Sequence, residues 1–539
     1  MPKLPCSRFG LLSFLVIALQ LGGLQPANAT SVYTYHNNVN RTGWNSTEST
    51  LTTKNVKPGR FGLLHTVSLD GLVNAQPLFI EGQSISSYGT RNIVYVATEN
   101  NTLYAIDGAS GVILLSRNFG AAVPDSYKSG DRNVYPVMGI LGTPVIDPLR
   151  NAIYFVTDTF ASGVDVFRLH AVALSTLGDI AQTVIGASTT LSDGTLYNFQ
   201  SRYQLQRAAL LENNGIIYVA FGSNGDINPP ISRGLILAYS AASLTPYPAH
   251  VTTDRLVESG NFYLTSVWQA GFGPAADSFG NVYFSTGNSD PRYPTYNGTY
   301  NLPESVLKVS SDLSTRLDSF TPSNYFALDE GDLDFGSGGT MVVPDQAGSV
   351  QLVMAGGKDG RAFLLNRNNL GGYNAGGPDR VVATVNGGPC WCGPAYFVGA
   401  DNVPRILTGG GNGVISWKLN TSASVSLAED SATTPAVVSG LPDNGGTYPV
   451  VSSNAQVAGT AVVWFVRRPQ TWSDVDPGTP LTLYAYDASN LQRQLFSATA
   501  GNWIAANYSN ATITPTVADG RVYVASNKQL QIFGEFHKE

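Results

Sequence analysis

The polar side chains that could do chemistry in this 539-residue chain fall in a few short, turn-rich stretches. These stretches are Gly222-Ser-Asn-Gly-Asp226, Trp268-Gln-Ala-Gly, Phe284-Ser-Thr-Gly-Asn288, Asp332-Leu-Asp334-Phe335 and Gly357-Lys358-Asp-Gly360. Together they offer carboxylates and an amide for a hard cation, a carboxylate for proton removal, an amine for a developing negative charge and an indole for stacking. Side chains of these types can bind a cation or move a proton if the fold brings them together.

The same residues also have a purely structural interpretation. Gly-Asn and Gly-Asp pairs are ordinary turn formers. Asp332 and Asp334 can accept backbone hydrogen bonds in a tight loop. Lys358 can lie on a solvated turn, and Trp268 can pack between two repeats. The elements that carry these stretches decide between the two interpretations.

Two cysteines, Cys390 and Cys392, lie close together in Gly-Gly-Pro-Cys-Trp-Cys-Gly-Pro. The third cysteine, Cys6, precedes an apolar N-terminal run. An exported protein with two cysteines tends to pair them, and here the pair would close a small ring around Trp391. A two-thiolate metal site is the alternative, although zinc would need two further ligands and no nearby histidine supplies them.

The elements around these stretches repeat along the chain. Each unit is a short apolar strand, a turn and a second apolar strand, as in Asn92 to Gly111, which reads NIVYVATENNTLYAIDGASG. We count eight such units, and their first strands carry the marker residues Tyr95, Tyr154, Tyr218, Tyr283, Met354, Leu407, Trp464 and Tyr523. Helical periodicity longer than about two turns is absent from the sequence. The pattern therefore predicts an all-β repeat protein.

The spacing of the units predicts a closed ring. The eight markers lie 53 to 71 residues apart, and one four-stranded sheet with its loops fits that period. A ring of such sheets covers every sheet face and leaves only short edges. We therefore expect one eight-bladed β-propeller, with seven blades as the alternative if the weak unit Arg405 to Trp417 is false. The polar stretch Ser31 to Asn55 should lie outside the repeat core, and its strand Val32 to Tyr35 is a candidate to close the ring.

The N-terminus has the pattern of a signal peptide. Lys3 and Arg8 precede the apolar run Phe9 to Leu21, and Ala27-Asn-Ala29 is a small-residue cleavage pattern. The run is shorter than the ~20 residues of a membrane-spanning helix, so an anchor is the weaker alternative. We predict a signal peptide at 1–29, a polar extension at 30–60 and a single propeller domain at 61–539. The mature chain should be exported, to the periplasm or outside the cell.

Composition narrows the class of partner. Without Lys3 and Arg8 the chain keeps 29 basic against 38 acidic residues, and it has no basic run. Nucleic acid is therefore not an expected partner. Charged residues make up 13% of the chain, and hydrophobic residues make up 43%. This balance is typical of a folded, exported, turn-rich β protein rather than a disordered one.

The pattern Val-Tyr-Val, a turn, Leu-Tyr-Ala-Ile-Asp and Thr/Ser-Gly resembles the pyrroloquinoline-quinone (PQQ) repeat of the eight-bladed quinoprotein alcohol dehydrogenases. The chain looks like an exported PQQ-repeat-like protein over nearly its whole mature length. Stretches that carry this likeness include Asp70-Gly-Leu-Val-Asn-Ala-Gln-Pro77, Gly139-Ile-Leu-Gly-Thr-Pro-Val-Ile-Asp147, Asp332-Leu-Asp-Phe-Gly-Ser-Gly-Gly339 and Thr514-Pro-Thr-Val-Ala-Asp-Gly520. Because a fold does not fix a function, the likeness specifies the fold more than the activity.

The resemblance implies a role for each candidate residue. Asn288 falls at the amide ligand of a Ca²⁺ ion, and Asp226 at its carboxylate ligand, where these enzymes usually carry glutamate. Asp334 falls at the catalytic base, and Lys358 at the basic contact to the quinone. Trp268 is the nearest match to the aromatic platform on which the quinone stacks. The implied activity is a PQQ- and Ca²⁺-dependent oxidation of an alcohol or a sugar.

Two departures from the family pattern favour a second hypothesis. Many of these dehydrogenases carry two adjacent cysteines near the cofactor, with an arginine beside them. The matching region near Met138-Gly139 has neither. The alternative function is therefore a non-catalytic propeller scaffold that binds proteins or glycans in the cell envelope or outside the cell. Convergence of Asp226, Asn288, Asp334 and Lys358 on one end of the propeller axis would favour the enzyme.

Overall fold

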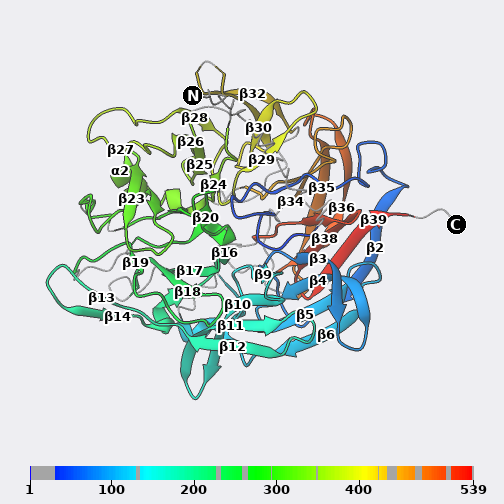
Figure 1. The fold of residues 1–539 in the computed structure, drawn as a ribbon, viewed down its shortest axis with the longest axis horizontal. Coiled ribbons are helices and arrows are strands. Elements are labelled where there is room, and N and C mark those ends of the chain that lie inside the picture. The colour runs from blue at the N-terminus through cyan, green and yellow to red at the C-terminus, as the bar shows by residue number, and fades with distance from the viewer. Residues whose placement is uncertain are drawn as a thin grey trace.

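The protein, seen here as a computed structural model, is an eight-bladed β-propeller (Figure 1). The structure describes Met1 and residues 31–128, 134–225, 232–257, 265–289, 291–292, 294–346, 350–422, 424–433, 446–467, 476–504 and 512–536. The expected signal peptide and Asp226 lie outside these residues. The eight-bladed prediction is confirmed, and the unit at Arg405 to Trp417 forms a blade of its own.

Each blade is an antiparallel sheet of four strands in chain order. The first blade has β3 (Leu78–Ile85), β4 (Gly89–Ala97), β5 (Thr102–Asp107) and β6 (Ile113–Asn118). The second has β9 (Val145–Asp147), β10 (Ala152–Ala161), β11 (Val164–Ala173) and β12 (Asp179–Val184). The third has β16 (Leu211–Asn213), β17 (Ile216–Ser223), β18 (Leu235–Ser240) and β19 (Val251–Thr252), and β15 (Gln204–Leu205) also pairs with β17. The fourth has β20 (Ala275–Ala276), β21 (Val282–Ser285), β22 (Val306–Val309) and β23 (Arg316–Thr321), which β27 (Gly372–Tyr373) extends in parallel.

The remaining blades follow the same plan. The fifth has β24 (Thr340–Val342), β25 (Leu352–Gly356), β26 (Arg361–Asn366) and β28 (Ala383–Asn386). The sixth has β29 (Ala395–Val398), β30 (Pro404–Thr408), β31 (Ile415–Asn420) and β32 (Ser426–Ala432). The seventh has β33 (Val450–Ser452), β34 (Val462–Arg467), β35 (Thr479–Asp487) and β36 (Gln494–Trp503), with β1 (Trp44–Asn45) parallel to β33. The eighth has β37 (Thr516–Ala518), β38 (Arg521–Ser526), β39 (Gln529–Glu535) and β2 (Phe61–Ser68).

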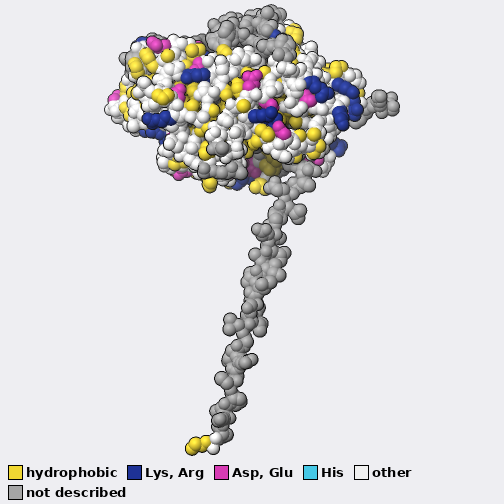
Figure 2. Space-filling model, turned by 90° about the horizontal axis from the view of Figure 1, so that it is seen from above, with side chains coloured by type: hydrophobic (Ala, Val, Ile, Leu, Met, Phe, Trp, Pro, Cys, Tyr) yellow, Lys and Arg dark blue, Asp and Glu magenta, His cyan; other side chains and the backbone are white. Residues whose placement is uncertain are grey.

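The loops contain a few short helices, turns and hairpins. They are the hairpins β7 (Val123–Pro124) with β8 (Val137–Met138) and β13 (Ser188–Thr190) with β14 (Leu196–Asn198), the helices α1 (Asp125–Lys128) and α2 (Tyr325–Gly331), and the 3₁₀ turns η1 (Ser201–Tyr203), η3 (Gln269–Gly271) and η4 (Phe335–Ser337). In the part of the chain that the structure describes, no helix is long and apolar enough to cross a membrane. On the face in view in Figure 2, Lys and Arg side chains are interspersed with Asp and Glu.

The ring closes with a strand from each end of the chain. β2 pairs with β39 as the outermost strand of the last blade, and the two lie side by side in Figure 1. The closing strand is thus Phe61–Ser68, and the expectation that Val32 to Tyr35 would close the ring is wrong. Val32 instead forms a single bridge with Phe79 of the first blade. β2 closes the ring because its apolar residues Phe61 and Val67 are buried in the last blade's interfaces.

The polar extension lies inside the ring, contrary to the expectation that it would lie outside the core. Its carbonyls accept backbone hydrogen bonds from blades on every side. The acceptor–donor pairs are Tyr33 with Ile146, Val39 with Ala276, Asn40 with Val342, Thr42 with Tyr396 and Gly43 with Val451, at 2.7–3.0 Å. First strands of successive blades contact one another, which places these strands nearest the axis. The extension therefore threads along the axis and satisfies the inner edges of the blades.

The marker residues lie on the second strand of each blade and are buried. Several marker tyrosines reach into the next blade. The hydroxyls of Tyr95, Tyr154 and Tyr218 donate to the carbonyls of Leu174, Ala241 and Ser311, at 2.7, 2.8 and 2.6 Å. Tyr523 of the last blade donates to Gly108 of the first, at 3.1 Å. These four marker tyrosines are therefore hydrogen-bonded staples between neighbouring blades, whereas Tyr283 donates to Asp277 of its own blade.

Candidate functional site

Three of the sequence-predicted residues meet between blades four and five. Asn288 follows β21, Asp334 precedes β24 and Lys358 follows β25. The backbone N–H of Asn288 donates to the Asp334 carboxylate at 3.2 Å, and the backbone N–H of Lys358 donates to the Asp334 carbonyl at 3.0 Å. The loops after β21 and β25 and the loop before β24 thus meet at one place.

The centre of this cluster is a buried ion pair. The Lys358 amine lies 2.7 Å from the Asp334 carboxylate, and the two side chains are 5% and 8% exposed. The same amine donates to the carbonyl and carboxylate of Asp332, at 3.0 and 3.2 Å. Burial opposes the charge on Lys358, but the carboxylates of Asp334 and Asp332 outweigh it and raise the pKa of the lysine. Lys358 is therefore a cation at physiological pH and pairs with the Asp334 carboxylate.

Asn288 places a side-chain amide beside this ion pair. Its amide nitrogen donates to the Asp332 carboxylate at 3.1 Å. Its amide oxygen is buried and has no hydrogen-bond partner among the residues that the structure describes. Buried polar atoms are normally satisfied, so this oxygen marks a place for a donor or a cation. An amide oxygen and nearby carboxylates are the donor set of a hard cation such as Ca²⁺.

Trp268 lies against the same loops, directly before η3. A Cβ added at Gly287 would lie 3.0 Å from the Trp268 ring and 3.1 Å from the Asp334 carboxylate. A side chain at position 287 would therefore crowd both the indole and the carboxylate. Within the described part of the chain the indole nitrogen of Trp268 is buried without a partner. Trp268 thus lies beside the Asp334 loop, whereas Asp226 lies outside the described residues.

Two site residues escaped the sequence analysis as functional candidates. The Arg207 guanidinium lies 4.4 Å from the ring centre of Trp268 and 5.3 Å from that of Trp391. The Lys358 amine lies 5.6 Å from the Trp391 ring. Cations over indole faces are attracted by the ring quadrupole. Position inside the Cys-Trp-Cys ring was a signal for Trp391, but no sequence motif marks Arg207.

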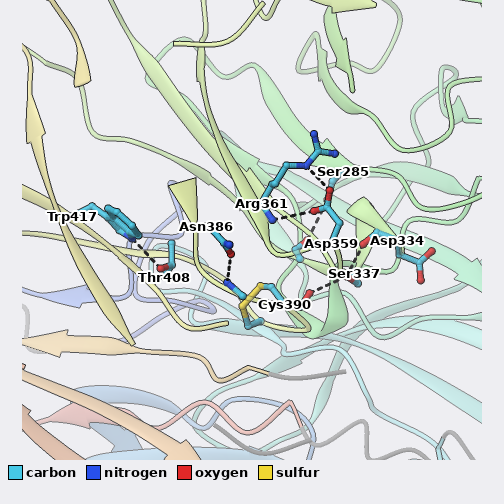
Figure 3. Close-up of a disulfide and its surroundings, with 12 residues drawn as sticks. Ser285, Asp334, Ser337, Asp359, Arg361, Asn386, Cys390, Thr408 and Trp417 are labelled. Carbon is cyan, nitrogen blue, oxygen red and sulfur yellow. Dashed lines mark hydrogen bonds and ion pairs between the residues drawn. A yellow bond between two sulfur atoms is a disulfide. The ribbon is translucent and has the colours of Figure 1, made fainter. Parts of the chain in front are cut away.

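The disulfide loop contacts the site directly (Figure 3). Cys390 and Cys392 form a disulfide. The Ser337 hydroxyl lies 2.8 Å from the Asp334 carbonyl and 2.9 Å from the Cys390 carbonyl, and so joins the two loops. The N–H of Cys390 donates to Gly357 at 3.2 Å, next to Lys358. Both cysteines also line a small glycine-rich cavity of about 20 Å³ between blades five and six. The disulfide loop therefore supports both members of the ion pair.

Comparison with known structures identifies the fold. The quinohemoprotein alcohol dehydrogenase from Comamonas testosteroni is similar, with a TM-score of 0.58 at 16% identity over 95% of this chain and 81% of that chain. The quinohemoprotein alcohol dehydrogenase ADHIIG from Pseudomonas putida HK5 gives a TM-score of 0.59 at 13% identity over 94% and 81% of the two chains. A europium-containing methanol dehydrogenase gives 0.60 at 11% identity over 94% and 98%. No protein-family model matches the sequence, and no curated protein matches it significantly.

Proposed function

Since the chain has the eight-bladed PQQ-type propeller fold of the quinoprotein alcohol dehydrogenases, we propose that it is a PQQ- and Ca²⁺-dependent dehydrogenase of an alcohol or a sugar. The observation that carries the proposal is the buried pair of Asp334 and Lys358 beside Asn288 and Trp268. Four residue types that the chemistry needs thus meet at the contact of two blades. The proposal includes export of the mature chain.

The Asn288 amide oxygen fits a cation ligand, but the described residues contain no group of three or more His, Cys, Asp or Glu side chains that could hold a metal ion. The Asn288 amide oxygen is an unsatisfied buried acceptor, and the Asp334 carboxylate accepts from the same residue's N–H. Asp226 would complete the ligand set. The Trp268 indole suits a flat ring, but the Arg207 guanidinium covers it. We propose that Arg207 leaves the Trp268 face when the cofactor binds and then pairs with an acidic group.

Asp334 is the base in this proposal. A bound quinone would supply the acceptor for the hydride, two electrons and one proton, that leaves the alcohol carbon. Asp334 takes the hydroxyl proton of the substrate, and the Lys358 amine at 2.7 Å holds its carboxylate in place. Lys358 also places a positive charge where negative charge develops on the acceptor. Asn288 orients the cation and, through its N–H, the Asp334 carboxylate.

The test is reconstitution. Purified mature protein is incubated with PQQ and Ca²⁺, and a panel of alcohols and sugars is screened for reduction of an artificial electron-acceptor dye. The proposal expects turnover with at least one alcohol or sugar, and none with Asp334→Asn. Absence of turnover together with absence of PQQ binding would favour the scaffold hypothesis, in which the propeller binds a protein or a glycan. An intact 1–29 segment in mass spectra of the secreted protein would contradict export by signal cleavage.

A further inference from the structure

A fully buried glutamate, Glu304, lies behind the ion pair without contacting it directly. Its side chain is 0% exposed, and it precedes β22 in the fourth blade. Its backbone φ is +49°, in the left-handed region that side-chain-bearing residues rarely adopt. Such a conformation persists only where the surroundings fix it, and it is enriched at functional sites.

Glu304 joins the two loops that carry the site. Its backbone N–H donates to the Gly287 carbonyl at 3.1 Å, one residue before Asn288. Its carboxyl oxygen Oε2 accepts the backbone N–H of Phe335, one residue after Asp334. The other oxygen, Oε1, is buried and has no hydrogen-bond partner among the described residues. Glu304 therefore contacts the chain on both sides of the Asn288–Asp334 contact, through its backbone on one side and its side chain on the other.

The charges around Glu304 disfavour its ionised form. Asp329 faces it from α2, Asp334 from the start of η4 and Lys358 from the turn after β25. Burial, then the charges of Asp329 and Asp334, raise the pKa of Glu304 well above its usual range, against the Phe335 N–H and Lys358. Lys358 is already shared by Asp332 and Asp334. An ionised Glu304 would add a further buried negative charge beside one lysine.

We propose that Glu304 is a positioning residue that holds the Phe335 backbone as a neutral carboxylic acid and so keeps Asp334 on Lys358. A neutral acid accepts the Phe335 N–H without competing for the lysine. This role concerns the geometry of the pair and exists without cofactor. Its consequence for catalysis rests on the proposed function.

The proposal distinguishes two substitutions. Glu304→Gln keeps a neutral acceptor of the same shape, whereas Glu304→Ala removes the acceptor and leaves the Phe335 N–H unsatisfied. Glu212→Gln is the matched control, because Glu212 also accepts a backbone N–H, from Gly215 at 2.8 Å, but in a turn of blade three. Lys308, which donates to the Arg367 carbonyl, is the internal reference lysine.

The experiment measures the rate at which the Lys358 amine is acylated in the folded, cofactor-free protein, by peptide mass spectrometry. We expect Glu304→Gln and Glu212→Gln to label Lys358 within about twofold of wild type. Glu304→Ala should label it about tenfold faster, as one lost pKa unit of ion-pair strength implies, while Lys308 stays unchanged. A Glu304→Gln rate as high as that of Glu304→Ala would overturn the neutral-acid role. Equal rates in wild type and Glu304→Ala would overturn the positioning role.

Two further readouts keep the test decisive. If Glu304→Ala does not fold, the Lys358 acylation rate of Glu304→Gln is compared with that of wild type. Glutamine can replace a neutral glutamic acid, but it cannot replace an ionised glutamate or one that relays a proton, so this comparison still tests the neutral-acid role. Dye reduction is then measured on Glu304→Gln under the reconstitution conditions. Loss of dye reduction in Glu304→Gln with an unchanged Lys358 rate would overturn the neutral-acid role in catalysis. Because the labelling needs no quinone, it stands even if the proposed dehydrogenase activity fails.

Discussion

The Lys358 amine lies 2.7 Å from the Asp334 carboxylate, and both side chains are almost completely buried. Taking two charges out of water is costly, and the pair persists because each group compensates the other. The Asn288 N–H and the Asp332 oxygens complete the arrangement. A purely structural turn does not require a buried charge pair, so the pair is the main argument for a functional site.

Removing one member of the Lys358–Asp334 pair should lower the free energy of unfolding. Lys358→Met leaves Asp334 as a buried charge near Asp332, and we expect a loss of about 3–5 kcal/mol of unfolding free energy. The double variant Lys358→Met with Asp334→Asn should recover much of the loss. Urea denaturation measures both. Lys528→Met is the control, because its partner Asp476 lies on the surface and the pair is half exposed. A single variant as stable as this control would show that the buried pair has no energetic role.

The tyrosine staple between the first and last blades makes a second prediction. Tyr523→Phe removes the hydrogen bond to Gly108 without changing packing, and should cost about 1–2 kcal/mol. Tyr88→Phe, at an exposed tyrosine, should cost close to nothing. Thermal unfolding of the two variants checks this. Equal melting temperatures would mean that the hydroxyl does not hold the ring closed.

A buried acid near the first blade should make stability depend on pH. Burial raises the pKa of Glu99 to about 8, against a hydrogen bond from Asn74. The folded protein therefore keeps a proton that the unfolded chain loses near pH 4.5, and this contribution to stability falls as pH rises from about 4.5 to 8. Glu99→Gln cannot ionise, so its advantage over wild type should grow by up to about 1.4 kcal/mol per pH unit in that window. A constant difference between pH 5 and 8 would contradict a raised pKa.

The disulfide predicts the thiol content and a small energetic effect. The mature chain should show no free thiol when unfolded without reductant, and stoichiometric labelling would be inconsistent with this. Replacing Cys390 and Cys392 by serine keeps the backbone hydrogen bonds to Gly357 and Gly339. The ring is small, so the loss should stay well below the ~3 kcal/mol of a 15-residue loop. Calorimetry of the double variant measures it.

The blade number followed from the sequence because each unit carries its own local signal. Short apolar strands and turns recur within every blade, and each marker residue, a tyrosine in five of the eight units, lies on a second strand. The candidate residues share a related position: Asn288 and Lys358 lie just after second strands, and Asp334 lies in the loop before a first strand. In a propeller these positions converge whatever the intervening loops contain.

The parts that depend on contacts between distant loops could not be predicted. Arg207, Trp268 and Trp391 lie in separate loops between blades and meet only in the folded protein. No sequence motif around Arg207 indicates this contact. The extension was expected outside because it is polar, but its polar atoms are satisfied by the inner strands. Arg41 shows this, since it is fully buried and its guanidinium donates to Pro274, Leu210 and Tyr35 carbonyls.

The most direct measurement is the melting temperature of the mature protein with PQQ and Ca²⁺ together and separately. A ligand that binds only the folded state at a hundredfold excess over its dissociation constant stabilises it by ~2.7 kcal/mol, so the account predicts a clear rise. Asp334→Asn should keep the rise and lose dye reduction, because it keeps the shape and loses the base. Asn288→Ala should lose the rise. If neither PQQ nor Ca²⁺ moves the wild-type melting temperature, the dehydrogenase account is contradicted.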